Sequence, residues 1–190
     1  MYDAVLVSPH YHYAEDGQPI PAAKSARHQD LSLTLPLGLL YIAQHLHDTG
    51  FNLRVVHLPQ EIRALERLGL DAGQVAHPIE AILKNYPARV CGIQLHFYLY
   101  CGGALRVAEM YKQFFPEATV VLGGYMATAF WPKLLDASPA IDGIVLGEGE
   151  QTFRAIVEAT AAAGPAGLAC VPGVACRRPN GGASARPARK

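Results

Sequence analysis

The feature that most constrains this 190-residue chain is the alternation of short apolar runs with segments of helical periodicity. The apolar runs are rich in Val, Ile and Leu and end near Gly, Pro or His, which is typical of buried strands. They are Asp3–Ser8, Asn52–Leu58, Val90–His96, Ala118–Leu122 and Ile141–Leu146. The helical segments are Leu37–Thr49, Ile62–Leu70 with Ile79–Asn85, Ala104–Phe115, Ala127–Leu135 and Gln151–Ala163. This order predicts a doubly wound α/β domain, flavodoxin-like or Rossmann-like, with a mostly parallel five-stranded sheet covered by helices on both faces.

The composition changes near the C-terminus. After Val171, arginines are interspersed among Pro, Gly, Ala and Ser. Pro172–Arg178 could add a short edge strand that turns at Asn180-Gly181, and the remainder is typical of a flexible basic tail or the start of a linker. We therefore expect one domain over residues 1–178 and a tail or linker over residues 179–190.

The first helix has a clear start and is preceded by a long loop. Thr34 can cap this helix, with Pro36 near its first turn and Gly50 after its end. Its expected apolar stripe consists of Leu37, Leu40, Tyr41 and Leu46. The loop, Pro9–Ser32, leaves the first strand at the carboxyl edge of the sheet, where open parallel sheets bind ligands. A loop of this length inside a compact domain is usually functional or disordered.

Three other segments that follow strands should meet this loop at the same edge. Gln94–Gly103 is expected to be a helix-free aromatic stretch, Gly123–Thr128 begins with two glycines, and Gly147–Thr152 carries two glutamates. Two adjacent glycines let a ligand or a neighbouring backbone approach without meeting a Cβ, although they also occur where only a tight turn is needed.

Histidines supply candidate ligands at this edge. His10 and His12 lie on the first loop beside Tyr11 and Tyr13, and they either face a ligand together or are solvated. His96 ends the third strand and is the best single candidate for a ligand or proton-transfer role, with a partly buried structural histidine as the alternative. The remaining histidines are expected at surface or flanking positions: His45, His47, His57 and His77.

Several kinds of chemistry lack support in the sequence. Glu148 and Glu150 could form a catalytic pair or could favour the start of the last helix through its dipole. There is no Gly-x-Ser-x-Gly turn, no phosphate-binding glycine loop followed by Lys-Ser/Thr, and no dinucleotide fingerprint after the first strand. The spacing of the four cysteines matches neither a zinc site nor an iron–sulfur cluster motif, so buried or free thiols are expected at Cys91, Cys101, Cys170 and Cys176.

Charge and hydropathy favour no large polyanionic or membrane partner. The chain has 16 basic and 16 acidic side chains, so its net charge does not favour nucleic acid. No apolar stretch approaches the length of a membrane span, and the N-terminus is not typical of a signal peptide. We expect a cytoplasmic protein.

Four groups of residues follow one another in a recognisable order. They are Pro36–Ala43 with Gly50 and Val55-Val56, then Gly92-Ile93, then Val120–Tyr125, then Ile141–Phe153. In this order and spacing they resemble the N-terminal cobalamin-binding domain of cobalamin-dependent radical S-adenosylmethionine enzymes. The resemblance spans about residues 1–178.

The resemblance implies that cobalamin is the cofactor. The loop after the first strand reads Pro9–Ala14 and lacks the Asp-x-His-x-x-Gly sequence whose histidine ligates cobalt in other cobalamin proteins. Cobalamin would therefore bind base-off, with its lower face covered from the loop after the third strand and its nucleotide tail passing Gly123-Gly124. His96 would lie nearest the metal. The residues expected at the cofactor are His10, Tyr11, His12, Thr34, Leu35, Gln94, Leu95, His96, Phe97, Tyr98, Gly123, Gly124, Tyr125, Gly147, Glu148, Gly149, Glu150 and Thr152.

The resemblance also implies a partner module that this sequence lacks. That radical module would hold a four-iron four-sulfur cluster on a Cys-x-x-x-Cys-x-x-Cys motif and would bind S-adenosylmethionine. It would lie on the same full-length chain or on a separate subunit. No catalytic residue is expected in the present chain, which would serve a methyltransferase or a ring-forming enzyme. The alternatives are a stand-alone cobalamin-binding or sensor module and a degenerate domain that has lost the cofactor.

Overall fold

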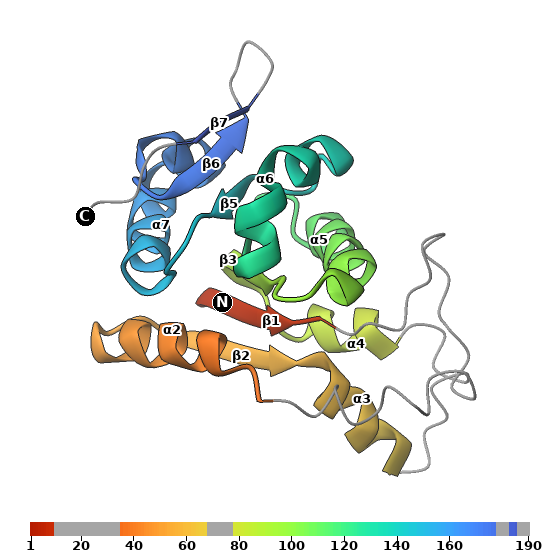
Figure 1. Ribbon diagram of the computed structural model, residues 1–190. Helices are drawn as coiled ribbons and strands as arrows, with labels where there is room; N and C mark the ends of the chain where they lie inside the picture. The colour runs from red at the N-terminus through yellow and green to blue at the C-terminus, as the bar shows by residue number, and fades with distance from the viewer. Residues whose placement is uncertain (10–34, 68–77, 178–182, 186–190) are drawn as a thin grey trace.

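The computed structural model describes residues 1–9, 35–67, 78–177 and 183–185 and confirms the predicted alternation of strands and helices (Figure 1). The strands are β1 Tyr2–Ser8, β2 Leu53–His57, β3 Ala88–Gln94, β4 Thr119–Gly123, β5 Gly143–Val145, β6 Val174–Arg177 and β7 Ala183–Ala185. The α-helices are α2 Leu37–Asp48, α3 Leu58–Arg67, α4 Pro78–Lys84, α5 Cys101–Phe114, α6 Tyr125–Ala137 and α7 Glu150–Ala163. Two 3₁₀ segments complete the described elements, η3 Tyr98–Tyr100 and η4 Gly164–Cys170.

These strands form one sheet in the order β2-β1-β3-β4-β5-β6-β7. The first five are parallel and have the strand order of a flavodoxin-like doubly wound sheet. The chain moves from β1 outward to β2 and then crosses back to β3 on the other side of β1. The β1/β3 boundary is therefore the topological switch point, where such sheets open a crevice for ligands.

Helices cover the sheet on two faces, each with its own apolar core (Figure 1). Helices α2 and α7 pack on one face, where Leu46 and Ile156 are fully buried. Helices α3, α4, α5 and α6 pack on the other, where Leu83 and Tyr111 are fully buried. Residues of β1 and β3 alternate between the two cores, because successive side chains of a strand point to opposite faces. No helix within the described ranges is long and apolar enough to cross a membrane.

The sheet is larger than the five strands expected. The predicted edge strand is present as β6, which pairs antiparallel with β5, and β7 pairs antiparallel with β6. The sheet thus continues past residue 178, into the segment expected to be a tail or linker. Arg177 anchors this extension, because its guanidinium donates hydrogen bonds to the carbonyls of Leu135, Ser138 and Ile141 around the end of α6.

The buried face of α2 differs from the predicted stripe. Leu39 and Leu46 are buried, whereas Leu37 and Tyr41 are 58% and 65% exposed. The segment is apolar around most of its circumference, so its periodicity alone did not identify the buried face. The position of the predicted N-cap is also wrong: the helix begins at Leu37 with Pro36 at the cap position and no side-chain cap, and Thr34 lies outside the described residues.

Candidate functional site

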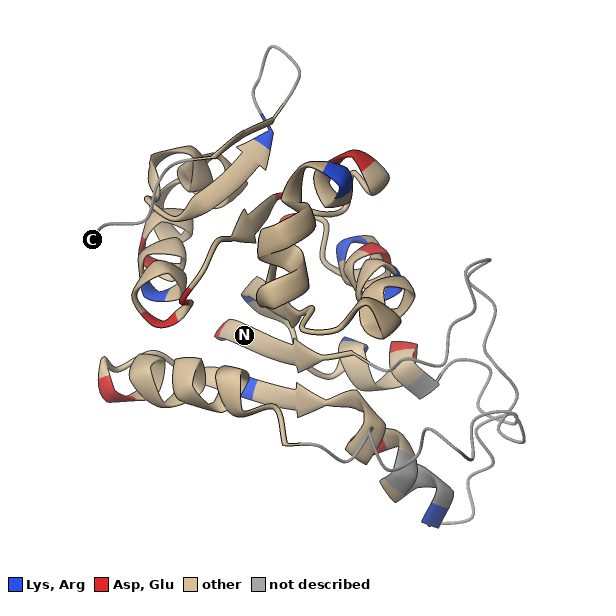
Figure 2. Ribbon diagram, viewed as in Figure 1, with Lys and Arg blue, Asp and Glu red and all other residues tan. Residues whose placement is uncertain are grey.

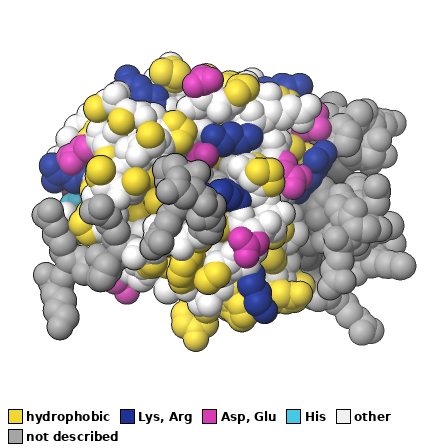
Figure 3. Space-filling view, turned by 90° about the horizontal axis from the view of Figure 1, so that it is seen from above, with side chains coloured by type: hydrophobic (Ala, Val, Ile, Leu, Met, Phe, Trp, Pro, Cys, Tyr) yellow, Lys and Arg dark blue, Asp and Glu magenta, His cyan; other side chains and the backbone are white. Residues whose placement is uncertain are grey.

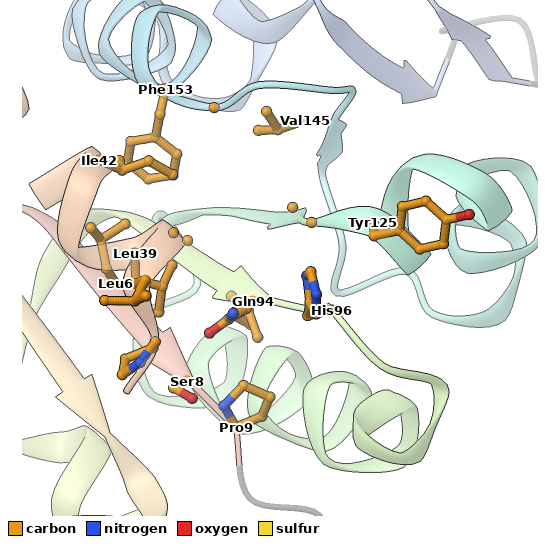
Figure 4. A pocket seen from close by; sticks show the side chains of 18 of the residues that line it. Leu6, Ser8, Pro9, Leu39, Ile42, Gln94, His96, Tyr125, Val145 and Phe153 are labelled. Carbon is orange, nitrogen blue, oxygen red and sulfur yellow. The ribbon is translucent and has the colours of Figure 1, made fainter. Parts of the chain in front are cut away.

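A pocket of ≈ 580 Å³ opens at the carboxyl edge of the sheet, at the switch point between β1 and β3 (Figure 4). Its wall comes from the ends of β1, β3 and β4, the starts of α2, α6 and α7, and the loop that joins β5 to α7. Its volume lies within the usual range for small-molecule and cofactor sites. The fold therefore brings three of the four predicted edge segments together, and the fourth, Pro9–Ser32, is described only at Pro9, which lines the pocket.

The deep part of the pocket is an apolar slot between the sheet and helices α2 and α7. The strand register places Leu6 beside Gly92 and Gly92 beside Val121, so these residues form one row across the sheet. Leu39 and Ile42 of α2 and Phe153 of α7 face this row (Figure 4).

Gly92 determines how α7 fits over this row. A Cβ at residue 92 would lie 2.4 Å from Cε2 of Phe153, so the absence of a side chain there makes room for the phenyl ring. The N–H of Phe153 donates to the carbonyl of Gly149 at 2.7 Å, which holds the first turn of α7 above the slot. Phe153 and Gly92 thus shape the inner end of the pocket.

The end of β3 sends alternate residues in opposite directions. Gln94 and His96 line the pocket, and Figure 4 shows both side chains between the α2 side and Tyr125. Leu95, between them, is 2% exposed and packs in the core on the other face. It contributes no side chain to the pocket, in contrast to its predicted place at the cofactor. The strand ends at Gln94, two residues before the predicted end.

The aromatic stretch after β3 is partly helical, in contrast to the helix-free stretch that we predicted. It forms η3, and α5 then begins at Cys101. Phe97 lines the pocket and is 56% exposed. Its ring packs edge-on against the ring of His96, with 4.6 Å between the two ring centroids. Tyr98 is 70% exposed and lies outside the pocket wall, whereas Tyr100 lines it.

The paired glycines after β4 line the pocket, and the second one is required by the backbone. Gly124 has φ 109° and ψ 177°, a conformation that is essentially restricted to glycine. A Cβ there would lie 2.9 Å from the carbonyl oxygen of Leu95. A Cβ at residue 123 would lie 3.5 Å from Val145 Cβ, which is an ordinary van der Waals contact. Gly124 therefore makes the tight turn, and both glycines form part of the pocket wall. Tyr125, which follows, also lines the pocket and is 72% exposed.

The loop between β5 and α7 forms the acidic side of the rim. Gly147, Glu148, Gly149 and Glu150 all line the pocket, and Figure 2 shows the acidic residues where the chain enters α7. Glu150 is the first residue of α7, so its charge is favoured by the helix dipole. Thr152 is 8% exposed and is packed beneath Gly173, outside the pocket wall, which differs from its predicted place at the cofactor.

Four polar residues that line the pocket are absent from the predicted cofactor residues: Ser8, His57, Tyr100 and Thr128. His57 ends β2 and lines the pocket, although a surface or flanking position was predicted. Its Nδ1 accepts a hydrogen bond from the N–H of Gln60 at 3.2 Å. Neutral His57 then carries its proton on Nε2 and cannot use Nδ1 as a metal ligand. Thr128 also lines the pocket, and its hydroxyl accepts the N–H of Gly147 at 3.0 Å. The position of His57 at the end of a strand could have indicated that it lies at the pocket.

The remaining predicted residues fall into two groups. Leu35 lines the pocket at the start of α2 and is 62% exposed. The others lie outside the described residues: His10, Tyr11, His12 and Thr34. Within the described ranges, no group of three or more His, Cys, Asp or Glu side chains is placed to hold a metal ion.

All four cysteines are free thiols, as predicted. Cys91 is fully buried in β3 beneath α5, and burial raises the pKa of its thiol far above the usual range. Cys101 starts α5, and partial burial raises its pKa as well. A thiol kept protonated in this way is a poor nucleophile.

Comparison with known proteins identifies a family. The family model of the B12-binding domain matches residues 30–157. The cytidylyl-2-hydroxyethylphosphonate methyltransferase of Streptomyces wedmorensis is 29% identical over 140 residues, which is 70% of this chain and 26% of that protein. The anaerobic magnesium-protoporphyrin IX monomethyl ester cyclase of Rubrivivax gelatinosus is 38% identical over 86 residues, or 45% of this chain and 16% of that protein.

A solved structure shares the fold. The cobalamin-dependent S-adenosylmethionine radical enzyme OxsB, solved with aqua-cobalamin and S-adenosylmethionine bound, matches with a TM-score of 0.65 and 13% identity. The match covers 98% of this chain and 22% of that one. The present chain thus spans about a quarter or less of the length of these proteins.

Proposed function

The chain belongs to the B12-binding domain family, and we propose that it binds cobalamin as the cofactor domain of a radical S-adenosylmethionine enzyme, most simply a methyltransferase. The observation that carries this proposal is the pocket at the β1/β3 switch point, which continues from an aromatic rim into an apolar slot along the sheet. The relatives include a methyltransferase and a cyclase, and the solved neighbour is a cobalamin-dependent S-adenosylmethionine radical enzyme.

The residues present fit a corrinoid in two respects. A corrin ring is broad and largely apolar, and the pocket opens between the exposed rings of Phe97 and Tyr125. A nucleotide tail is long and ends in a flat base, and the slot between Leu6, Val121 and the helix residue Leu39 is apolar. Exposed aromatic side chains around a concave site are typical of a ligand surface.

Base-off binding follows if the tail enters this slot. A base held between the sheet and α7 cannot reach cobalt at the same time, and the Asp-x-His-x-x-Gly histidine is absent after β1. His96 and Gln94, at the end of β3, are then the described side chains best placed to cover the lower face of the ring. Gly123 and Gly124 provide a backbone surface past which the tail can run.

Cobalt would supply methyl-group transfer or electron transfer when the cofactor is bound. This chain would contribute binding, orientation and the exclusion of water from the apolar slot. The S-adenosylmethionine and the four-iron four-sulfur cluster would belong to a radical module, on the same full-length chain or on a partner subunit. Among the described residues on the face seen from above, Lys and Arg side chains are interspersed with Asp and Glu (Figure 3).

The test is to mix the purified 190-residue chain with hydroxocobalamin, remove free ligand by gel filtration and record the visible spectrum. We expect corrinoid to co-elute with the protein and to show a base-off spectrum. A bound corrinoid with a base-on spectrum would contradict the tail slot but keep the cofactor assignment. If no corrinoid is retained at micromolar protein, the proposal that this domain binds cobalamin is wrong and the degenerate-domain alternative gains support.

A further inference from the structure

The described acidic and basic side chains that line the pocket are all of one sign. Among the described residues that line it, the carboxylates are those of Glu148 and Glu150, and no lysine or arginine is present. The other polar side chains that line it are uncharged or histidine: Ser8, His57, Gln94, His96, Tyr100, Tyr125 and Thr128. The pocket therefore offers carboxylate acceptors on its rim and lacks a described cationic side chain.

Arginines on the surrounding elements are already paired. Arg54 of β2 lies in a neighbouring groove, with its guanidinium 3.7 Å from the carboxylate of Glu61. Arg154 of α7 bonds to Glu158 at 2.8 Å, one turn further along the same helix. These two arginines are engaged by carboxylates outside the pocket, so they do not neutralise the acidic rim.

The chemistry of the corrin periphery gives this excess of negative charge a consequence for ligand binding. Mature corrinoids carry carboxamide groups around the ring, whereas their early precursors carry free carboxylic acids at the same positions. A carboxamide N–H can donate to a glutamate carboxylate, and a hydrogen bond to a charged acceptor is stronger than one between neutral groups. A peripheral carboxylate would instead be repelled by the two glutamates, with no described lysine or arginine to pair with it.

We infer that Glu148 and Glu150 make this pocket selective for amidated corrinoids and exclude corrinoids that carry free peripheral carboxylates. The inference rests on the proposed function, because it concerns the same pocket. It assigns the two glutamates a role in specificity in place of the catalytic pair that the sequence left open. Glu148 lies in the loop just before α7 and Glu150 is its first residue, and both line the pocket, where the ring periphery would lie.

The test compares two corrinoids that both lack the nucleotide tail. Cobinamide has amidated side groups and cobyrinic acid has free carboxylic acids, and both are used as dicyano complexes so that cobalt carries the same axial ligands. Binding to the 190-residue chain is measured by equilibrium dialysis at about pH 8, where carboxyl groups are ionised. We expect cobinamide to bind at least about tenfold more tightly, and we expect the preference to fall at high salt because screening weakens the repulsion.

Matched variants connect the preference to the glutamates. The double variant Glu148→Gln, Glu150→Gln keeps side-chain size and removes both charges, so its preference for cobinamide should fall by about tenfold. Glu117→Gln is the control, because Glu117 is exposed just before β4 at the opposite edge of the sheet. It should retain the wild-type preference.

Each result discriminates between the two proposals. Equal affinity of the wild-type chain for both corrinoids, or an unchanged preference in the double variant, would overturn the selectivity while leaving cobalamin binding in place. If neither corrinoid binds but hydroxocobalamin does, the tail dominates binding and the inference about the ring periphery is wrong. Failure to bind all three would reject the proposed function itself.

Discussion

The hydroxyl of Thr128 accepts a hydrogen bond from the backbone N–H of Gly147 at 3.0 Å, which ties the first turn of α6 to the acidic loop on the pocket rim. At the preceding residue, the N–H of Leu146 donates to the carbonyl of Gly173 at 2.8 Å. Gly147 itself has φ 74°, and a Cβ there would meet nothing within 4 Å, so packing does little to hold it. These two hydrogen bonds therefore help to position the loop that carries Glu148 and leads into α7.

Removing this contact should weaken cofactor binding more than folding. Thr128→Val keeps the side-chain shape but loses the acceptor, so we expect cobalamin affinity to fall by about threefold to tenfold. Thr128→Ser retains the hydroxyl and should stay close to the wild type. Visible titration gives the affinities, and thermal unfolding without cobalamin serves as the control. Equal affinities for the Val and Ser variants would show that the loop is held by other means.

His96 and Tyr98 make a direct comparison at the end of β3. His96 lines the pocket, whereas Tyr98 is exposed and is not part of the pocket wall. We expect His96→Ala to alter the visible spectrum of bound cobalamin with little effect on stability, because His96 is exposed. Tyr98→Ala should leave the spectrum unchanged. An unchanged spectrum and affinity in His96→Ala would remove this histidine from the cofactor site.

Gly124 should be the glycine least tolerant of substitution near the pocket. Gly124→Ala would force an L-residue into a glycine-only conformation and bring Cβ within 2.9 Å of the Leu95 carbonyl. We expect a loss of about 3 kcal/mol in the free energy of unfolding. Gly50→Ala is the comparison, because Gly50 also has positive φ but has open space around it, and it should cost about 1 kcal/mol. Urea denaturation measures both, and equal losses would contradict the contribution of the close approach.

Burial of Cys91 predicts a loss of stability in alkali. Its thiol has a pKa raised by burial in the folded protein, while the unfolded chain ionises near the ordinary value of 9.0. Above that pH the unfolded state binds fewer protons than the native state, so stability falls as pH rises, by up to about 1.4 kcal/mol per pH unit for this group. Below it the contribution is fully present.

Urea midpoints at about pH 8 and pH 10 test this dependence, which Cys91→Ala should reduce. Tyr111, whose pKa is raised mainly by burial, adds a similar effect above its ordinary value of 10.0. Its hydroxyl donates to the carbonyl of Tyr86 and accepts the N–H of Ala88, so Tyr111→Phe would remove the pH effect together with two hydrogen bonds. A wild-type midpoint that does not change between these two pH values would contradict the assignment for Cys91.

Local patterns determined the order of elements and the edge at which the site lies. Each apolar run of β-branched and aliphatic residues has a period that suits a buried strand, and each intervening segment has the period of a helix, so the five parallel strands could be predicted without knowledge of the packing. The glycines at residues 123, 124, 147 and 149 were also found from the sequence, because they follow strands whose carboxyl ends must meet. The resemblance to cobalamin-binding domains also followed from the sequence, because these residues occur in the order that is typical of that family.

Only the tertiary structure decided which side chains meet in the pocket. Leu95 and His96 are adjacent in the chain, yet strand alternation around the exact end of β3 sends one into the core and the other into the pocket. Thr128 and Gly147 lie 19 positions apart and become partners only when α6 and β5 pack together. Phe153 fits above the sheet because a glycine lies opposite it in β3. Contacts of this kind arise between segments far apart in sequence, where no periodicity connects them, and they exist only after the helices have packed on the sheet.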